Sequence, residues 1–260
     1  MSIGGRGIQS IEIGGRLLLA LAERVKPMML RDLAEAAGMP SAQAHAYLVS
    51  FRKLELVEQD VATGRYRLGP FALHLGLARL RASEPYQIAA DAVVSLVDRL
   101  DLAATISVWG TYGATVVRIQ ESSHQIHANV RPGTVFGLTN TATGRLFAAF
   151  LPERLVDPLI HAELRDPARR SQGAPASLAA LRAELAEVRR RGLATAHDMP
   201  VPGISALSAP IFDHSGQMQV AVTVMGPTQI VDCAEGGPHW RALDDFTRDL
   251  SVRLGHRPAA

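Results

Sequence analysis

Four residues between positions 42 and 46 have side chains suited to reading the edges of base pairs. Gln43 can form two hydrogen bonds with adenine, and the methyl groups of Ala42 and Ala46 can lie against the methyl group of thymine. His45 can contact a phosphate or a base. An exposed helical position without a base contact is an equal alternative for Gln43 and the favoured interpretation for His45. These residue types predict a DNA-reading surface if the chain places them on one exposed helix.

Arginines on either side of this segment can supply contacts to phosphate. The formal net charge is only +2, and residues 1–85 carry 11 Lys and Arg against 8 Asp and Glu. A charge excess this small cannot hold DNA by itself, so binding has to depend on where individual arginines point. A solvated helix face is the alternative for such arginines where no DNA-binding fold surrounds them. The candidates are Arg31, Arg52, Arg65 and Arg67.

A helix-turn-helix is predicted around these residues. Apolar residues at helical spacing predict a helix over residues 30–37, which Gly38 ends. Pro40 and Ser41 start the next helix, which extends to Lys53, and the Ser41 hydroxyl is expected to cap it. The second helix is the one expected to enter a DNA major groove.

Further elements complete the first domain. An amphipathic helix over residues 8–23 precedes the pair, with Ile11 among its expected buried residues. Two short strands joined by a turn at residues 62–64 follow the pair and form a wing that carries two of the arginines. Together these elements predict a winged helix-turn-helix DNA-binding domain over residues 8–69.

A linker helix is predicted over residues 70–84. Leu73, Leu77 and Leu80 form one apolar stripe, which neighbouring alanines widen. A helix that is apolar around most of its circumference needs partners on more than one side. We therefore expect it to connect two domains and to contact a second copy of the chain. Packing on its own wing alone is the alternative.

Residues 85–258 alternate helices with strands. The predicted helices cover residues 88–100, 141–151, 155–162, 178–191 and 239–255. The predicted strands cover residues 103–109, 114–120, 125–130, 193–196, 205–213 and 219–225. Antiparallel strands with helices outside them predict an α+β fold.

The chain lacks the motifs of catalysis and metal binding. It contains no Gly-x-Ser-x-Gly elbow, no phosphate-binding loop and no His-Glu-x-x-His pair. Its one cysteine, Cys233, has no second cysteine with which to form a zinc or redox pair. We expect no enzyme activity, no metal and no cofactor. Without an apolar run long enough for a bilayer, and without the apolar core of a signal peptide, the protein is expected to be cytoplasmic.

Several ordered motifs resemble the IclR family of bacterial transcription regulators. They are LRDLA at 30–34, AGMPS at 37–41, GRYRLG at 64–69, TATGRLFAAFL at 141–151, RRGLA at 190–194, GISALSAPIFD at 203–213 and GP at 226–227. This set covers nearly the whole chain. The resemblance implies a winged-helix domain joined by a helix to a GAF-like effector-binding domain. It also implies homodimers or tetramers and the control of operons in response to a metabolite.

Three positions depart from the family's pattern. Ala46 stands where the recognition helix often carries an arginine, which weakens any transfer of a known operator sequence. Glu55 stands where the turn before the wing usually has a glycine, and its negative charge lies on the expected DNA side. Arg145 replaces a lysine and keeps the charge.

The resemblance also implies an effector pocket between the strands of the second domain and the helix over residues 141–151. The N–H groups at the start of this helix favour a carboxylate. Ala206 and Met225 replace polar residues of the family, so we expect an aromatic or otherwise hydrophobic acid. For Ser208 and Thr223, strands with their polar faces outward are the alternative. The implied lining residues are Gln125, Ala128, Ala142, Thr143, Asp198, Ala206, Ser208, Thr223 and Met225.

The resulting hypothesis is a sequence-specific DNA-binding transcriptional regulator, repressor or activator, whose operator affinity depends on a small organic acid. The few base-reading groups favour two copies on a pseudo-palindromic operator. The alternative is a small-molecule-binding GAF-like protein or an enzyme without physiological DNA binding.

Overall fold

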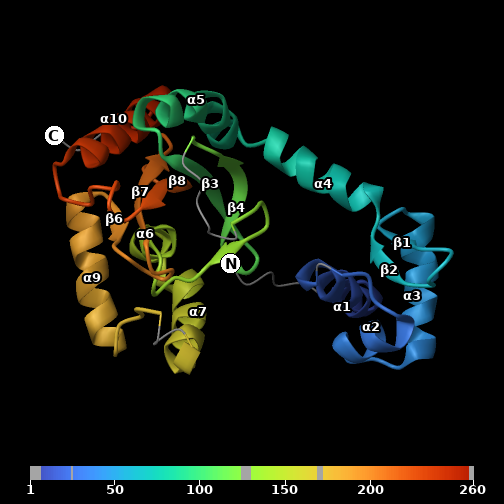
Figure 1. Cartoon of the computed structure of the whole chain (residues 1–260). Coiled ribbons are helices and arrows are strands. Elements are labelled where there is room, and N and C mark those ends of the chain that lie inside the picture. The colour runs from blue at the N-terminus through green and yellow to red at the C-terminus, as the bar shows by residue number, and fades with distance from the viewer. Residues whose placement is uncertain (1–6, 25, 124–129, 169–171, 258–260) are drawn as a thin grey trace. The chain divides into compact units, whose positions relative to one another are not determined.

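The computed structural model describes residues 7–24, 26–123, 130–168 and 172–257. The chain divides into two compact units, Met1–Ala82 and Ser83–Ala260 (Figure 1). Among the described residues, no helix has both the length and the apolar character needed to cross a bilayer.

The first unit contains the predicted helix-turn-helix and wing. Its elements are α1 (Gln9–Glu23), α2 (Leu30–Ala36), α3 (Ser41–Lys53), β1 (Val57–Gln59), β2 (Tyr66–Leu68) and α4 (Pro70–Arg81). β1 and β2 pair antiparallel, and Met28 forms an additional antiparallel bridge with Tyr66. The wing is thereby joined to the segment between α1 and α2 as well as to α3.

A small apolar core holds these elements together. Leu17 of α1, Leu33 of α2 and Leu48 of α3 have no exposed surface. Gly14 lets α1 approach α3 closely, because a Cβ atom there would lie 2.9 Å from a ring carbon of Tyr47. The glycine that costs helix propensity therefore serves the packing of the first helix on the recognition helix.

Two details of the first unit differ from the sequence expectations. Ile11 is 69% exposed, because the part of α1 that packs against the core begins one turn later, at Gly14. Ser41 is the first residue of α3 rather than its cap; Pro40 occupies the cap position, and the structure has no side-chain cap hydrogen bond there. The Ser41 hydroxyl is consequently exposed and available to other partners.

The helix α4 presents apolar side chains to solvent within this arrangement. None of its residues is buried, and Leu73, Leu75 and Leu77 are 65%, 48% and 46% exposed. At its start, the backbone N–H of Phe71 donates to the carbonyl of Glu55. The helix thus continues directly from the wing and exposes Leu73, Leu75 and Leu77 to solvent.

The second unit is a six-stranded antiparallel sheet with helices on both faces (Figure 1). Its helices are α5 (Glu84–Leu100), α6 (Ala142–Phe150), α7 (Glu153–Arg165), α9 (Leu178–Arg191) and α10 (Pro238–Arg253). Its strands are β3 (Ala103–Gly110), β4 (Gly113–Gln120), β5 (Val135–Phe136), β6 (Ala194–Ala196), β7 (Ile204–Phe212) and β8 (Met218–Pro227). Their order in the sheet is β5-β4-β3-β8-β7-β6. The predicted α+β fold is confirmed.

The strand expected over residues 125–130 lies almost entirely outside the described residues. Only Val130 is described, and it belongs to no strand. The two-residue strand β5, which was not expected, pairs with β4 at Ala114 and Thr115. A strand this short leaves no alternating pattern by which sequence could reveal it.

The two faces of the sheet have different compositions. The core face, which packs against α5 and α10, carries Ala104, Ile106, Leu207, Ala209, Ile211, Val220, Val222 and Val224. The α6 face packs against α6, with α7 and α9 beside it. Its middle carries small and hydroxyl-bearing residues, while Trp109, Phe212 and Met218 pack in the same cluster. The small and hydroxyl-bearing residues are Thr105, Ser107, Ala194, Ser208, Ala221 and Thr223. Residues that alternate along one strand thus supply two unlike layers.

Candidate functional sites

The recognition helix α3 separates buried from exposed residues cleanly. Ala44 and Leu48 have no exposed surface and anchor it to the core. The predicted DNA-reading residues lie between and before these anchors and are all exposed: Ser41, Ala42, Gln43, His45 and Ala46. Small side chains therefore dominate the accessible N-terminal half of the helix, and Gln43 is its most versatile hydrogen-bonding group.

The three arginines at the wing are exposed but held by neighbouring groups. Arg67 forms an ion pair with Glu58 on the paired strand. The Arg52 Nη1 donates to Gln59 Oε1 at 3.0 Å, and the Arg65 Nη1 donates to the carbonyl of Pro27 at 3.2 Å. These contacts orient guanidinium groups along the wing while leaving them accessible. Arg31 is exposed on α2.

Two local features shape the wing. The backbone N–H and hydroxyl of Thr63 donate to Asp60 Oδ1 at 2.7 and 2.9 Å, and these bonds lower the pKa of the Asp60 carboxyl. Glu55, between α3 and β1, has φ +56°. That left-handed conformation explains why a glycine suits this turn, since glycine adopts it without a steric penalty.

A pocket lies in the second unit between the start of α6 and the ends of β6, β7 and β8. Its cavity volume is about 70 Å³. Five of the residues implied for the effector line it: Ala142, Thr143, Ala206, Thr223 and Met225. Further lining residues were not predicted: Val130, Phe136, Thr141, Ala196, Met199, Pro200, Val201 and Ile204.

Sheet register explains why several of these residues meet. Ala196 pairs with Ala206, and Ala206 pairs with Met225. Directly paired residues of an antiparallel sheet point to the same face, so these three form one row across the pocket floor. Hydrophobic alternation alone could have indicated Ala196 and Ile204, but the pairing that brings β6 to β8 is not readable from one sequence.

A chain of hydroxyl groups borders this floor. The Thr223 Oγ1 lies 2.7 Å from Thr143 Oγ1 and 2.8 Å from Ser208 Oγ. Ser208 and Thr223 are 0% and 1% exposed, so the alternative of polar strand faces turned outward is wrong. Ser208 does not line the pocket itself; it contacts the Thr223 hydroxyl from the neighbouring strand. Hydroxyl groups therefore join the sheet to the first turn of α6.

Asp198 does not line the pocket. Its Oδ1 accepts a hydrogen bond from the Gly203 N–H at 2.6 Å, and its own N–H donates to Ser205 Oγ at 3.0 Å. These bonds close the loop that contributes Met199, Pro200 and Val201 to the pocket. The structure thus gives Asp198 a positioning role instead of direct lining. Gln125 and Ala128 lie outside the described residues.

The turn before α6 is held in place by polar contacts. The Thr141 hydroxyl accepts from the Gly144 N–H at 2.9 Å and donates to the Gly137 carbonyl at 2.8 Å. A side chain at Gly144 is excluded, because a Cβ atom there would lie 1.9 Å from the Gly137 carbonyl oxygen. The N–H groups of the first residues, Ala142 and Thr143, have no acceptor inside the helix because no preceding turn exists.

Two charged side chains clamp the same turn from outside. The Glu163 carboxylate of α7 accepts from the N–H groups of Leu138 and Thr139 at 2.9 and 3.0 Å, and from the Thr139 hydroxyl at 2.8 Å. The Arg145 Nε donates to the Thr139 carbonyl at 3.1 Å, and its Nη2 lies 3.3 Å from Glu184. Burial lowers the pKa of Arg145, and the charge of Glu184 partly opposes that.

Cys233 and the acidic residues give no sign of a reactive or metal centre. Burial and the nearby charge of Asp232 raise the pKa of the Cys233 thiol, so it favours the protonated form. Its Sγ lies 3.9 Å from the carbonyl of Ala206. Within the described ranges, no three His, Cys, Asp or Glu side chains gather closely enough to hold a metal ion.

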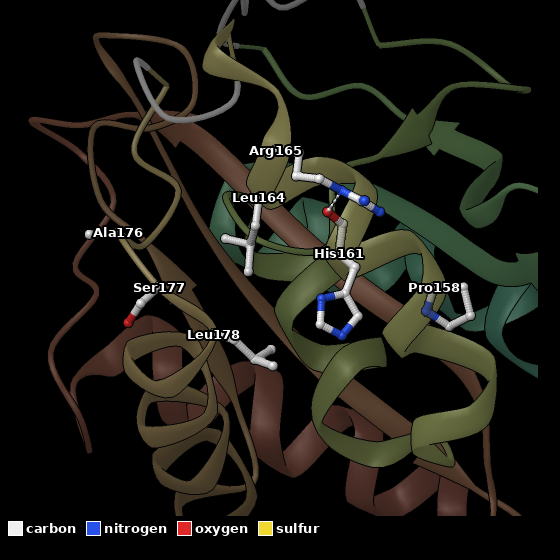
Figure 2. Close-up of a pocket in the computed structure, with 7 residues that line it drawn as sticks. All are labelled: Pro158, His161, Leu164, Arg165, Ala176, Ser177 and Leu178. Carbon is white, nitrogen blue, oxygen red and sulfur yellow. Dashed lines mark hydrogen bonds between the residues drawn. The ribbon is translucent and has the colours of Figure 1, made fainter.

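A second hollow lies between α7 and the start of α9 (Figure 2). The Arg165 Nε donates to the His161 carbonyl of its own helix at 3.0 Å, and the Ser177 hydroxyl caps α9 at Ala180. Arg165 and Ser177 are therefore engaged locally, and most of the lining is exposed. Its residues are Pro158, His161, Leu164, Arg165, Ala176, Ser177 and Leu178. None of the predicted site residues lies there.

Comparisons with known proteins match both units. Residues 80–252 match the model of the bacterial transcriptional regulator IclR C-terminal domain, and residues 10–61 match the IclR helix-turn-helix domain. The glycerol operon regulatory protein of Streptomyces griseus is 30% identical over 258 residues, which cover 96% of this chain and 98% of that protein. The relatives are named as transcriptional regulators and not as enzymes, in agreement with the expectation of no enzyme activity.

Solved structures are similar to this chain over nearly its whole length. HmgR of Pseudomonas aeruginosa is 37% identical, with a TM-score of 0.60, over 97% of this chain and 100% of that chain. An IclR homologue from Microbacterium hydrocarbonoxydans, solved as a complex with 4-hydroxybenzoate, is 18% identical with a TM-score of 0.75, over 94% of this chain and 98% of that chain. The second likeness shows the fold alone. The chain belongs to the IclR family of transcriptional regulators, and its first unit is the DNA-binding helix-turn-helix of that family.

Proposed function

We propose that the chain regulates transcription in the cytoplasm, and that a small organic acid with an apolar body controls its affinity for an operator. The observation that supports an acid effector is the apolar pocket at the first turn of α6. Hydroxyl and N–H groups border its mostly apolar lining there. We take residues 8–69 as the DNA-binding domain, 70–84 as a linker and 85–258 as the effector-binding domain.

In this proposal α3 enters the major groove. The exposure of Ser41, Ala42, Gln43, His45 and Ala46 supports base contacts from the N-terminal half of the helix. The exposed Arg31, Arg52, Arg65 and Arg67 contact phosphates or the minor groove. Because Arg67 is paired with Glu58, its phosphate contact has to compete with an existing ion pair.

Two copies of the chain are needed for specificity in this proposal. One half-site read chiefly by Gln43 and alanine methyl groups discriminates poorly between sequences. The exposed leucines of α4 support a contact between copies, since three of them are about half exposed or more. A dimer or tetramer on a pseudo-palindrome then multiplies the discrimination of one helix.

The effector half is supported by the lining and by a relative. The pocket contains no Lys, Arg or His among its described lining residues, so an apolar body is well matched there. The complex of the homologous protein with 4-hydroxybenzoate is an aromatic acid bound to the same fold. An effector alters operator affinity to the extent that it binds the two states of the protein unequally.

The DNA half is tested by titrating the purified protein against the fragment upstream of its own gene. We expect a shift whose affinity falls steeply as salt rises, since phosphate contacts release counterions. Changing both Arg65 and Arg67 to Ala should weaken binding to all sequences, and Gln43→Ala should relax the choice at one base pair. Arg154→Ala, an exposed arginine of α7, is the control. Unchanged DNA binding in the wing and Gln43 variants would contradict the assignment.

The effector half is tested by a thermal-shift screen. Aromatic and short aliphatic acids that bind the folded state raise the melting temperature. An acid that does so should also change operator affinity. Thr143→Val should reduce both responses and keep DNA binding. Loss of DNA binding in this variant would contradict the assignment of the pocket as the effector site. An acid response that the substitution leaves intact would contradict it too.

A further inference from the structure

A single side chain forms hydrogen bonds with both the recognition helix and the turn of the wing. Gln59, the last residue of β1, is partly buried. Its Oε1 accepts from the Nη1 of Arg52, in the last turn of α3, at 3.0 Å, and its Nε2 donates to the carbonyl of Gly64 at 3.0 Å. One amide group therefore bridges the end of α3 and the turn between β1 and β2 (Figure 1).

The two bonds of this bridge suit a glutamine. Its amide carries an acceptor and donors on one planar group, so it can accept from a guanidinium and donate to a carbonyl at once. A glutamate at this position would accept from Arg52 but would place a carboxylate against the carbonyl oxygen of Gly64. Because the amide is neutral, Arg52 also keeps its full charge, whereas Arg67 is paired with the carboxylate of Glu58.

The turn of the wing has hydrogen bonds of its own. The carboxylate of Asp60 accepts from the N–H and the hydroxyl of Thr63. The N–H of Asp60 donates to the carbonyl of Arg65, and the N–H of Gly64 donates to the carbonyl of Asp60, both at 2.8 Å. A turn closed by its own bonds moves as one piece. The bond to the Gly64 carbonyl therefore sets the position of the whole turn relative to α3.

The other end of the bridge, Arg52, is one of the proposed phosphate contacts. A guanidinium carries several N–H donors in a planar fork, so one can bond Gln59 while others bind a phosphate. A phosphate held there fixes the guanidinium, and the bridge then links its position to that of the wing. A helix and a wing at a fixed spacing fit best where the DNA groove has the matching width, which depends on base sequence.

We propose, on the basis of the phosphate contact proposed for Arg52, that Gln59 is a positioning residue for DNA recognition. It fixes the wing relative to the phosphate bound at the end of α3. The chain thereby selects among operators by the groove width of the base pairs under the wing, in addition to the bases that α3 reads.

Gln59→Met tests this proposal in the full-length chain, because methionine has nearly the same length and removes both hydrogen bonds. Arg52→Ala and the double variant complete a double-mutant cycle. Gln219→Met is the matched control: Gln219 of β8 is also partly buried, and its Nε2 donates to Asp213 Oδ2 at 2.6 Å, but it belongs to the second unit. Melting curves establish that each variant is folded.

The base pairs under the wing are located by hydroxyl-radical footprinting of the upstream fragment. They are the ones whose protection is lost when Arg65 and Arg67 are both changed to Ala. In one copy of the fragment these base pairs are replaced by an A·T tract, which has a narrow minor groove, and in another by G·C pairs. Each protein is titrated against the original fragment and both copies by fluorescence anisotropy.

For the unmodified chain we expect the affinities for the two altered fragments to differ by about 5-fold or more. Gln59→Met should bind the original fragment about 5-fold more weakly, as for the loss of one or two hydrogen bonds, and should distinguish the altered fragments less. In that background, Arg52→Ala should weaken binding by a factor about 3-fold smaller than in the unmodified chain, since the two residues act together. Gln219→Met should behave like the unmodified chain.

The outcomes separate the bridge from the phosphate contact. If Arg52→Ala leaves DNA binding unchanged, the proposed phosphate contact fails and the bridge fails with it. If Arg52→Ala weakens binding but Gln59→Met does not, only the positioning role is overturned. Losses that simply multiply in the double variant would show two independent contacts and overturn it too.

Two further results would overturn the selection by groove width. One is an unmodified chain that binds both altered fragments equally, and the other is a Gln59→Met chain that distinguishes them as well as the unmodified chain does. If Gln59→Met does not fold, Gln59→Leu, which also lacks both bonds, decides by the same titrations.

Discussion

The two faces of the effector-domain sheet come from the same strands but use opposite kinds of residue. Ile106, Val222 and Leu207 on the core face alternate with Thr105, Thr223 and Ser208 on the α6 face, and all are at most 1% exposed. Aliphatic side chains gain free energy on burial, whereas hydroxyls gain little and cost stability when unpaired. The difference teaches that the core face is built for stability, while the α6 face buries hydroxyl groups, of which those of Thr105 and Ser107 have no hydrogen-bond partner among the described residues.

The largest expected effect is on the core face. Leu207→Ala removes a side chain without exposed surface from the layer under α5 and α10. We expect a loss of about 3–5 kcal/mol of unfolding free energy, from lost burial and from the cavity left behind. Urea denaturation measures it. A loss under about 1 kcal/mol would show that this layer does not carry the stability of the domain.

The next effect concerns how the α6 face is held. Glu163→Gln weakens the carboxylate bonds to Leu138 and Thr139, and we expect a cost of about 1–3 kcal/mol. The turn before α6 should also position its N–H groups less well, so acid affinity should fall although Glu163 lies outside the pocket. Glu153→Gln, an exposed acid of the same helix, is the control. Equal acid affinity in the two variants would contradict the role of the Glu163 hydrogen bonds in acid binding.

Converting the α6 face into an apolar one should change stability still less. A variant with Thr143→Val, Thr223→Val and Ser208→Ala removes all three bonded hydroxyls together and leaves no partner orphaned. Replacing both sides of a buried hydrogen bond by apolar groups is nearly neutral, so we expect a change within about 1 kcal/mol. Denaturation of this variant beside Leu207→Ala gives the comparison directly. A large loss of unfolding free energy in the triple variant would show that the hydroxyls stabilise the domain.

The smallest effect lies in the turn that joins β7 and β8, strands shared by both faces. Partial burial opposes ionisation of Asp213, but hydrogen bonds from the Ser215 hydroxyl and from the N–H groups of Gln217 and Ser215 outweigh it and lower the pKa of the carboxyl. Its contribution to stability is therefore present above the unfolded pKa of about 4 and is lost as the pH falls through the lower folded value.

Asp213→Asn should accordingly lower the melting temperature slightly at pH 7, and the difference from the unmodified chain should shrink as the pH falls below about 4. Melting curves recorded from pH 7 down to pH 3 measure it. A difference that stays constant over this range would contradict a role for the ionised carboxylate.

Local patterns in the sequence predicted most of the elements, whereas contacts between distant segments were harder to predict. The strands over residues 103–109 and 205–213 were found within about one residue, because buried strands bounded by turns give a clear signal. Thr143, Ser208 and Thr223 were selected through the family resemblance. Ala196 was missed because one sequence does not reveal that β6 pairs with β7 in this register.

Other differences have similar local causes. Asp198 looked like a pocket residue, but its carboxylate bonds Gly203 and closes a loop, which only the folded chain reveals. Ser41 suited a helix cap by type, yet α3 begins one residue earlier than that role requires. Residue type predicts what a side chain can do, while the bonds actually formed depend on the backbone around it.

The central claim is that the α6 face is the effector site of a DNA-binding regulator. Fluorescence anisotropy of the upstream DNA fragment, titrated with protein in the presence and absence of an acid that binds, tests it most directly. We expect the acid to change the operator affinity of the unmodified chain by about 5-fold or more. The triple hydroxyl variant should bind the same DNA equally well and ignore the acid. An acid response that survives in that variant, with the same magnitude, would contradict the claim.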